Sequence, residues 1–370
     1  MAKNRRPDFI LLITAGLIIL LGFIIFTSVS MASIASSAEN VEDLNLPYFL
    51  IRQFAMGVLP GILAGFLLYK LPLEIIKKAA PALLIINLVL IGMVFIPGLG
   101  MTARGATRWI QIGGLSFQPS EFLKLTFILY LASWLSERKN IDVDKRIFSE
   151  NLLAFGIVCA VISGLILLQP DLSTLIVIIS TGFVMYFTYR TPLRHILAIG
   201  VTGGLGLTLF IVSSSYRMQR VYDLLNSGAD PQGLSFQAQQ ALIAIGSGGL
   251  LGTGFGVGSQ KGFIPFVMSD SIFAAYAEEA GFIGSILLIS LFLVFAWRGV
   301  KIAKRNKDSF FSLVAVGISF WIFFQAFIHI GAMSGILPIT GIPLPFISHG
   351  RAHFVTELAA LGVLLNISKS

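Results

Sequence analysis

The chain has 370 residues, of which 56% are hydrophobic and only 12% are charged, and its mean hydropathy is +0.87. Because so much apolar surface cannot be buried in a soluble core, this composition excludes an ordinary soluble protein and predicts a polytopic membrane protein. The net charge of +8 follows from basic residues that flank the predicted spans, so it indicates contact with anionic lipid rather than with nucleic acid.

Ten apolar stretches have about the 20 residues that a helix needs to cross the hydrocarbon core of a membrane. They lie at residues 9–29, 47–69, 74–96, 119–136, 149–168, 171–189, 192–212, 272–298, 309–334 and 343–366. We therefore predict an all-α fold of about ten transmembrane helices, in which residues 1–370 form a single membrane domain. The first stretch is too long, and is followed by too many others, to be a cleaved signal peptide.

Lys and Arg are unevenly distributed between the loops that connect these stretches. If the N-terminus is cytoplasmic, most of the 26 basic residues fall on the cytoplasmic side, as the positive-inside rule requires. This distribution predicts a multi-pass protein with both termini in the cytoplasm. The longest segment on the outer side is then 213–271, which is too long for a structureless loop and should carry structure of its own.

Within that segment, the sequence FQAQQALIAIGSGGLLGTGFGVGSQKG combines a predicted amphipathic helix, residues 236–245, with a run of glycines. The glycines allow the backbone to turn or to approach a ligand closely. A nucleotide-binding loop would need Ser or Thr after its Lys, whereas Lys261 is followed by Gly262. We interpret the segment as a re-entrant hairpin packed against the bundle, which is compatible with a cradle for a lipid-linked phosphate.

Carboxylates near the start of the eighth stretch are candidates for function. Asp270 directly precedes it, and Glu278 and Glu279 lie about two turns inside it. Carboxylates in a membrane are costly unless they are paired or hydrated, so they are seldom there without a role. Asp270 and Glu278 would lie roughly 12 Å apart along a helix, too far to share one proton, so we expect them to have separate tasks.

Further ionisable residues precede or begin the fourth and sixth stretches. Glu121 and Lys124 are spaced i, i+3 on one helix face, where they can form an ion pair, line a polar cavity, or do both. Arg108 and Trp109 would lie at the outer interface, where a Trp is often only an anchor. Asp171, in LQPDLST, can simply cap the sixth helix.

Together these groups predict one polar cavity on the outer side of the membrane, open to the bilayer and suited to an anionic, lipid-borne substrate. The ionisable residues on or near that side are Arg108, Glu121, Lys124, Asp171, Arg217, Arg220, Lys261 and Asp270.

The last stretch contains PFISHGRAHFVTEL, in which His349, His353 and Glu357 fall on one helix face. Three such side chains could bind a metal ion, but protease chemistry is excluded because Gly350 stands where a zincin needs Glu. The alternatives are hydrogen-bonded histidines, with Arg351 near a phosphate, and packing without function.

Five motifs, in the same order as here, resemble the signatures of the FtsW/RodA family of shape, elongation, division and sporulation proteins. They are GATRWIQIGGLSFQPSEFLKL, LQPDLST, SFQAQQALIAIGSGGLLGTGFGVGSQKG, SDSIFAAYAEEAGFIG and GILPITGIPLPFIS. The resemblance covers nearly the whole chain, residues 9–366. The long first outer loop and the GATRW context look more like the FtsW branch than the RodA branch.

The resemblance implies a ten-span peptidoglycan glycosyltransferase in the bacterial cytoplasmic membrane. Its substrate would be lipid II, an undecaprenyl-diphosphate-linked disaccharide peptide, which it would polymerise at the outer face of the membrane during cell division or elongation. A class B penicillin-binding transpeptidase and other division or elongation complex proteins would be its partners.

The resemblance also implies roles for individual residues. Asp270, in SDSIF, aligns with the family's essential carboxylate and would act as the general base, or would position the acceptor hydroxyl. Positive charge would help the diphosphate to leave, and a divalent cation such as Mg²⁺ or Mn²⁺ is an alternative source of it. The residues assigned to substrate binding are Arg108, Trp109, Glu121, Lys124, Asp171, Arg217, Arg220, Lys261 and Ser348, and none is assigned as a metal ligand.

The sequence departs from the family pattern at several positions. Phe266 stands where the family has Glu, and Met268 or its neighbour stands where the family has His. The family's Ser-Tyr-Gly-Gly-Ser-Ser is replaced here by Ser-His-Gly-Arg-Ala-His from Ser348 onward. A flippase for lipid-linked precursors would also need a polar cavity, and a non-catalytic scaffold of the cell-wall machinery would tolerate altered motifs. Both therefore stand as alternatives to the polymerase.

Overall fold

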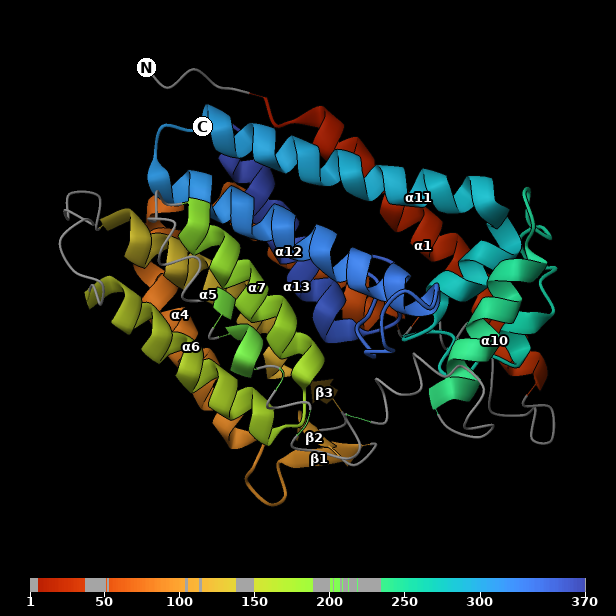
Figure 1. Ribbon diagram of the computed structural model, residues 1–370. Helices are drawn as coiled ribbons and strands as arrows, with labels where there is room; N and C mark the ends of the chain where they lie inside the picture. The colour runs from red at the N-terminus through yellow and green to blue at the C-terminus, as the bar shows by residue number, and fades with distance from the viewer. Residues whose placement is uncertain are drawn as a thin grey trace.

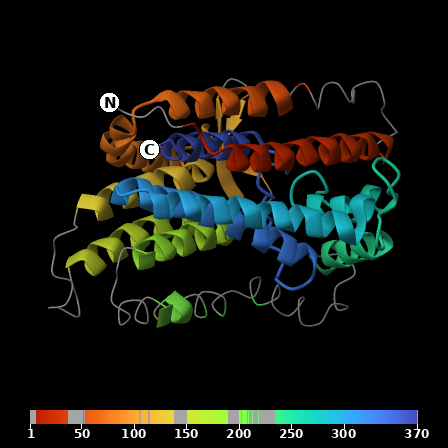
Figure 2. The ribbon, with the colours of Figure 1, turned by 90° about the horizontal axis from the view of Figure 1, so that it is seen from above.

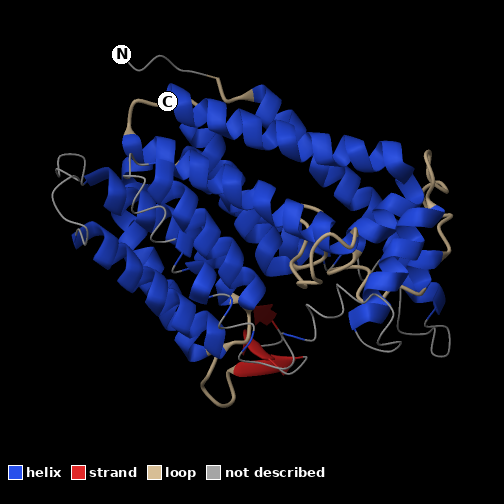
Figure 3. Ribbon diagram, in the orientation of Figure 1, coloured by secondary structure: helices blue, strands red, loops and turns tan. Residues whose placement is uncertain are grey.

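A computed structural model describes residues 6–36, 51, 53–103, 106–112, 115–137, 150–188 and 234–369, together with a few residues between 200 and 218. Figure 1 shows a bundle of long helices, and Figure 3 shows strands confined to one corner of it. The helices are α1 (Phe9–Ser36), α3 (Leu59–Lys70), α4 (Leu73–Met93), α5 (Pro119–Glu137), α6 (Glu150–Leu168), α7 (Leu172–Thr188), α10 (Leu234–Ser247), α11 (Ile272–Arg305), α12 (Ser309–Met333) and α13 (Arg351–Ile367).

Several of these helices have the length and composition of membrane spans. Within the described ranges, α1, α4, α11 and α12 are long and apolar enough to cross a membrane, and α6, α7 and the segment Phe54–Lys70 are shorter apolar helices. The chain is therefore a membrane-embedded, mostly helical protein. The predicted stretch 192–212 and residues 213–233 lie largely outside the described residues, so the count of ten spans stays a prediction.

The centre of the bundle is formed by α5, α12 and α13. α12 packs against α5, α7, α11 and α13, and α13 also packs against α3. Trp321 of α12 and Phe127 of α5 are fully buried between these helices. Along one side of this centre, α1 and α11 pack against each other, as Figure 2 shows from above.

Small residues allow α3 and α13 to approach each other closely. A side-chain carbon added to Gly65 would lie 2.6 Å from the backbone oxygen of Leu358, and one added to Gly61 would lie 2.6 Å from Leu358 Cδ1. Contacts of this kind are typical of helix pairs in membranes, where close backbone packing replaces the hydrophobic effect as the source of association.

Replacing Gly65 by Leu is expected to destabilise the protein by about 1–3 kcal/mol, because the added side chain must push α13 away. The melting temperature of the purified protein in detergent measures this effect. Gly16→Leu in α1 is a matched control, since nothing lies within 4 Å of a carbon added there. If both variants melted at the same temperature, close packing at Gly65 would not be a source of stability.

The two ends of the described chain meet at one end of the bundle (Figure 1). Asp8 N donates to Ser368 Oγ at 3.0 Å, and Arg298 of α11 donates to both Asp8 carboxylate oxygens, through Nε at 3.2 Å and through Nη2. Burial raises the pKa of Asp8, but hydrogen bonds from Arg298 and Leu11 and the Arg298 charge outweigh it, so the pKa is lowered overall. The pair therefore stabilises the fold at neutral pH and loses this effect as the pH falls through the lowered pKa.

A small sheet was not part of the all-α prediction. β1 (Gly100–Ala103), β2 (Ala106–Ile112) and β3 (Leu115–Phe117) form an antiparallel meander in the order β1-β2-β3. β2 contains β-branched and aromatic side chains, including Thr107 and Trp109, which favour strands. The segment is too short and too polar to be recognised as a membrane span, so the hydropathy pattern indicated only a loop.

The predicted start of the last membrane helix, residue 343, was wrong. This helix, α13, begins only at Arg351. Pro343 and Pro345 lack backbone donors and disfavour helical conformation before them, and Phe346 has a φ of 62°. Residues 334–350 therefore form a connection between helices, which we call the α12–α13 loop.

Candidate functional site

The candidate site is centred on Asp270, which lies half-buried just before α11. Asp270 lies near the end of residues 248–271, a segment without α-helix that we call the glycine loop. Gly341 of the α12–α13 loop faces the Asp270 carboxylate, because a side-chain carbon added to Gly341 would lie 3.9 Å from Asp270 Oδ2. Gly341 has a φ of 70°, which glycine adopts without strain. The two loops thus meet at the carboxylate.

Hydrogen bonds from the α12–α13 loop hold the backbone directly before Asp270. Ser348 Oγ donates to Ser269 O at 2.7 Å, and His349 N donates to Met268 O at 2.8 Å. Ser348 is fully buried and its Oγ also accepts from Leu344 N at 2.8 Å. Ser348 therefore joins the two loops rather than presenting a free hydroxyl to a substrate.

The residue after Asp270 is held from a third direction. Ser271 Oγ donates to Pro265 O at 3.0 Å and accepts from Gln237 Nε2 of α10 at 2.8 Å. The amphipathic helix predicted at 236–245 is confirmed as α10. Its role at the site is to supply Gln237, which binds Ser271. Asp270 is thereby fixed on both sides by contacts between distant parts of the sequence.

Glu278 and Glu279 shape the glycine loop rather than continuing a straight helix. α11 is interrupted at Gly281, with φ 68° and ψ −168°, so the two carboxylates lie on a short helix before the break. Glu278 accepts from Gln260 N at 2.8 Å and from Lys261 N at 3.0 Å. These bonds satisfy backbone donors of the loop, as a buried turn requires.

Lys261 lies in a buried ion pair with Glu279. Its Nζ is 2.5 Å from Glu279 Oε1 and donates to Ser28 Oγ of α1 at 2.7 Å, and its side chain is only 5% exposed. The pair ties the glycine loop to both α1 and α11. Contact between Lys261 and a diphosphate would require this ion pair to open.

Glu121 and Lys124 form the ion pair that their spacing predicted. Lys124 Nζ lies 2.7 Å from Glu121 Oε2, donates to Gln325 Oε1 at 3.0 Å and lies over the Trp321 ring, and both charged side chains are buried. Gln325 Nε2 in turn donates to Pro343 O at 2.9 Å. The pair therefore supports the α12–α13 loop from inside the bundle.

Arg108 and Asp171 are also brought together. Arg108 Nη1 is 3.8 Å from Asp171 Oδ1, Arg108 Nε donates to Gln169 O at 3.1 Å, and Nη2 donates to Pro170 O. Asp171 caps α7, because its Oδ1 accepts from Thr174 N at 3.3 Å, and its Oδ2 also accepts from Thr174 Oγ1 at 2.9 Å. The neighbouring Ser173 donates to Thr340 O at 2.6 Å, so this cluster also reaches the α12–α13 loop.

The remaining sequence-based assignments have mixed outcomes. Trp109 is half-buried in β2, opposite Met101 of β1. Arg217 and Arg220 lie outside the described residues. Arg108 pairs with Asp171, Glu121 with Lys124, and Lys261 with Glu279, and each of these pairs is linked to one of the two loops. The second and third pairs are buried, whereas the Arg108 side chain is 28% exposed.

His349, His353 and Glu357 take separate partners instead of converging on a metal ion. The His349 ring stacks on Phe26 of α1 with centroids 5.3 Å apart, His353 Nε2 lies 2.9 Å from Ser348 O, and Glu357 Oε2 accepts from Phe346 N at 2.7 Å. No group of three metal-ligating side chains is found among the described residues. The His349 ring therefore contacts α1, and the His353 ring contacts the backbone of the α12–α13 loop.

Two buried polar side chains at the site were not identified from the sequence. Gln237 binds Ser271, and Gln325 joins Lys124 to the α12–α13 loop. A signal existed for Gln325, since an amide within an apolar helix of a membrane protein is seldom without a partner. Gln237 stands next to other polar residues of α10 and carries no such signal.

Comparison with known proteins gives the family. The chain matches a family model described as "Cell cycle protein", for FtsW, RodA and SpoVE, over residues 8–370. It is 39% identical over 369 residues to stage V sporulation protein E of Bacillus subtilis (strain 168), covering 99% of this chain and 98% of that protein. It is 33% identical over 356 residues to the probable peptidoglycan glycosyltransferase FtsW of Trichlorobacter lovleyi, covering 95% of this chain and 92% of the relative.

Solved structures agree with this assignment. One neighbour, from work on the structural coordination of polymerization and crosslinking by a peptidoglycan synthase complex, has a TM-score of 0.77 and 27% identity over 98% of this chain and 97% of its own. The crystal structure of the rod shape determining protein RodA of Thermus thermophilus has a TM-score of 0.70 and 27% identity over 98% and 96% of the two chains. The chain therefore belongs to the FtsW/RodA/SpoVE family.

Proposed function

We propose that this protein is a peptidoglycan glycosyltransferase that polymerises lipid II into glycan strands, in division or elongation, with an FtsW-like role. The observation that carries the proposal is the position of Asp270, a half-exposed carboxylate held by two loops in a membrane-embedded protein. Relatives named as probable peptidoglycan glycosyltransferases support the same chemistry.

The reaction joins two lipid-linked sugars. The acceptor's 4-hydroxyl oxygen attacks the anomeric carbon of the donor, the new glycosidic bond forms, and the bond from that carbon to the diphosphate oxygen breaks. Asp270 accepts the hydroxyl proton, and the bonding electrons leave with the polyprenyl diphosphate. Attack from the side opposite to the leaving group converts an α-linked donor into a β-linkage.

Fixed geometry around Asp270 is the contribution of the fold. A general base must lie within hydrogen-bond reach of the proton that it removes, and small displacements are costly. Ser348 and His349 on one side, and Gln237 through Ser271 on the other, restrain the backbone that carries the carboxylate. We assign these residues to positioning, not to contact with the sugar.

Positive charge for the leaving diphosphate is proposed to come from Arg108, whose side chain is 28% exposed, and from Arg217 and Arg220. Lys261 contributes only if its pair with Glu279 opens. A Mg²⁺ or Mn²⁺ ion bound to the diphosphate would supply further positive charge. No step above depends on such an ion.

We further propose a bacterial cytoplasmic membrane location with both termini in the cytoplasm and the two loops at the outer face. The lipid II donor and acceptor would reach Asp270 there, and a class B penicillin-binding transpeptidase and other division or elongation complex proteins would join the assembly. The meeting of the two chain ends at one end of the bundle supports this arrangement.

A polymerisation assay tests the proposal. The purified protein, reconstituted with its transpeptidase and supplied with lipid II, should produce glycan strands that a muramidase digests. Absence of strands, together with transfer of lipid II between leaflets of the same vesicles, would instead identify a flippase. Absence of both activities from folded protein would identify a scaffold.

Ser348→Ala should lower the turnover number about tenfold with little change in KM, because the variant loses the bond that restrains Ser269 while leaving substrate contacts unchanged. Polymerisation rates at several lipid II concentrations separate the two constants. Ser348→Thr keeps the hydroxyl and should recover part of the rate. A rise in KM alone would place Ser348 in substrate binding instead.

A further inference from the structure

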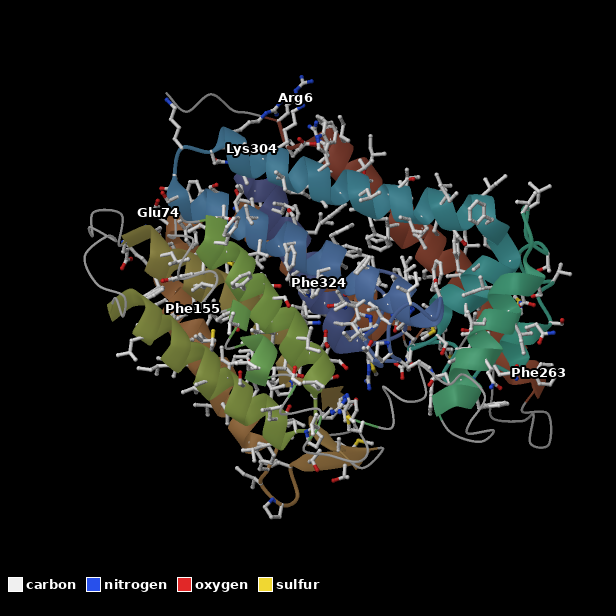
Figure 4. All side chains as sticks on the ribbon, viewed as in Figure 1. Arg6, Glu74, Phe155, Phe263, Lys304 and Phe324 are labelled. Atoms are coloured by element: carbon white, nitrogen blue, oxygen red, sulfur yellow. The ribbon has the colours of Figure 1, made fainter. Side chains whose placement is uncertain are left out.

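A cavity of about 250 Å³ lies where the two chain ends meet, at the end of α11 far from Asp270. Its charged and large apolar lining residues are Arg6, Asp8, Phe9, Ile10, Arg298 and Arg305. Figure 4 labels Arg6 and Lys304 at this end of the bundle. The glycosyl transfer proposed above uses none of these residues.

Positive charge exceeds negative charge in the cavity. Three of its lining side chains are guanidinium groups and only one is a carboxylate. Asp8 is hydrogen-bonded by Arg298 and also feels the charge of Arg305, so one carboxylate faces three guanidinium groups, of which Arg6 and Arg305 are exposed. Guanidinium groups bind phosphate oxygens in paired, planar hydrogen bonds, so this excess suits a phosphate group better than a simple halide.

Apolar surface continues from the cavity along the membrane-facing side of α1. Phe9 is 52% exposed and Ile10 47%, and both line the cavity, while Ile13 one turn further is 59% exposed. On α11, Trp297 is 57% exposed and lies under the Lys301 ammonium. A soluble phosphate would use the arginines alone, whereas a lipid would use both the arginines and this apolar surface.

We propose that the cavity binds the head group of an anionic phospholipid from the adjacent leaflet, with the phosphate on Arg6 and Arg305 and the acyl chains along Phe9 and Ile10. Basic pockets between transmembrane helices bind anionic head groups in this way on the cytoplasmic side of membranes. Arg298 is not a primary ligand, because Asp8 holds it, and the pair forms the floor of the site.

Native mass spectrometry of the full-length purified protein tests the site. The protein is titrated with phosphatidylglycerol or with zwitterionic phosphatidylcholine, and bound lipid is counted. We expect tighter binding of phosphatidylglycerol, and an Arg6→Gln/Arg305→Gln variant that binds it about thirtyfold more weakly, from the loss of two basic contacts. Lys77→Gln/Lys78→Gln is the matched control, because it removes the same charge from α4, away from the cavity, and should bind as the native protein does.

Three results would overturn the proposal. Equal weakening in the control variant would show diffuse attraction to basic residues rather than a site. Equal binding of the two lipids would show that the net charge of the head group does not determine binding. Displacement of phosphatidylglycerol by inorganic phosphate or by an acidic peptide at similar concentrations would show a site for soluble anions. Melting curves in neutral lipid establish that the compared variants are folded.

Discussion

Asp270→Asn is expected to reduce lipid II polymerisation by about 10²–10⁴-fold, because an amide cannot accept the proton of the attacking hydroxyl. The substitution conserves shape, and Asp270 N already donates to Phe266 O through the backbone, so the fold should be retained. Initial rates of glycan formation by the reconstituted complex measure the effect, and Asp270→Glu should recover some activity if proton transfer is the role.

Glu74→Gln is the matched control for charge. Glu74 is an exposed carboxylate at the start of α4, at the other end of the bundle from Phe263 of the glycine loop (Figure 4). This variant should polymerise lipid II at the native rate. If Asp270→Asn polymerised lipid II at the native rate, Asp270 would not be the general base, and another carboxylate near the two loops would have that role.

Lys124→Met should produce the largest loss of stability, about 3–5 kcal/mol, because it leaves the buried Glu121 carboxylate without its counter-charge. Lys124 Nζ lies 2.7 Å from Glu121 Oε2, and both residues are only 4% exposed. The variant also removes the hydrogen bond that Lys124 donates to Gln325, the residue that supports the α12–α13 loop. The melting temperature and the yield of monodisperse protein in detergent measure the loss.

The double variant Glu121→Gln/Lys124→Met isolates the cause. It removes both charges, so it should regain most of the stability that the single variant loses. If the double variant were as unstable as Lys124→Met, packing of the lysine stem would be the reason instead of the unpaired carboxylate. Activity measured on the double variant then shows whether the pair also serves catalysis.

Helices and local ion pairs could be predicted from the sequence because their determinants are local. The span at 119–136 begins at Pro119, as α5 does, and Glu121 with Lys124 pair through the i, i+3 spacing of one helix. The break at Gly281 could not be predicted in this way. It depends on the glycine loop, where Gly254 N donates to Glu279 O and Phe282 N donates to Gly249 O.

The sequence also could not predict which residue pairs with a charged side chain when the two lie in distant segments. Lys261 was expected near a phosphate, yet its ammonium is bound by Glu279 and by Ser28, which is 233 positions away. Likewise, His349 and His353 were predicted to lie on one helix face. Pro343, Pro345 and the contact to Met268 delay the start of α13 until Arg351, so His349 precedes the helix. Helical periodicity says nothing about such long-range contacts.

The C-terminal half of α1 touches both loops that flank Asp270. Ser28 binds the Lys261–Glu279 pair of the glycine loop, Phe26 stacks on His349 of the α12–α13 loop, and a side-chain carbon added to Gly22 would lie 2.7 Å from Phe346 O. A change in the tilt of α1 would therefore be expected to move both loops together. Since a helix tilts to match the thickness of its bilayer, we expect the geometry around the carboxylate to depend on that thickness.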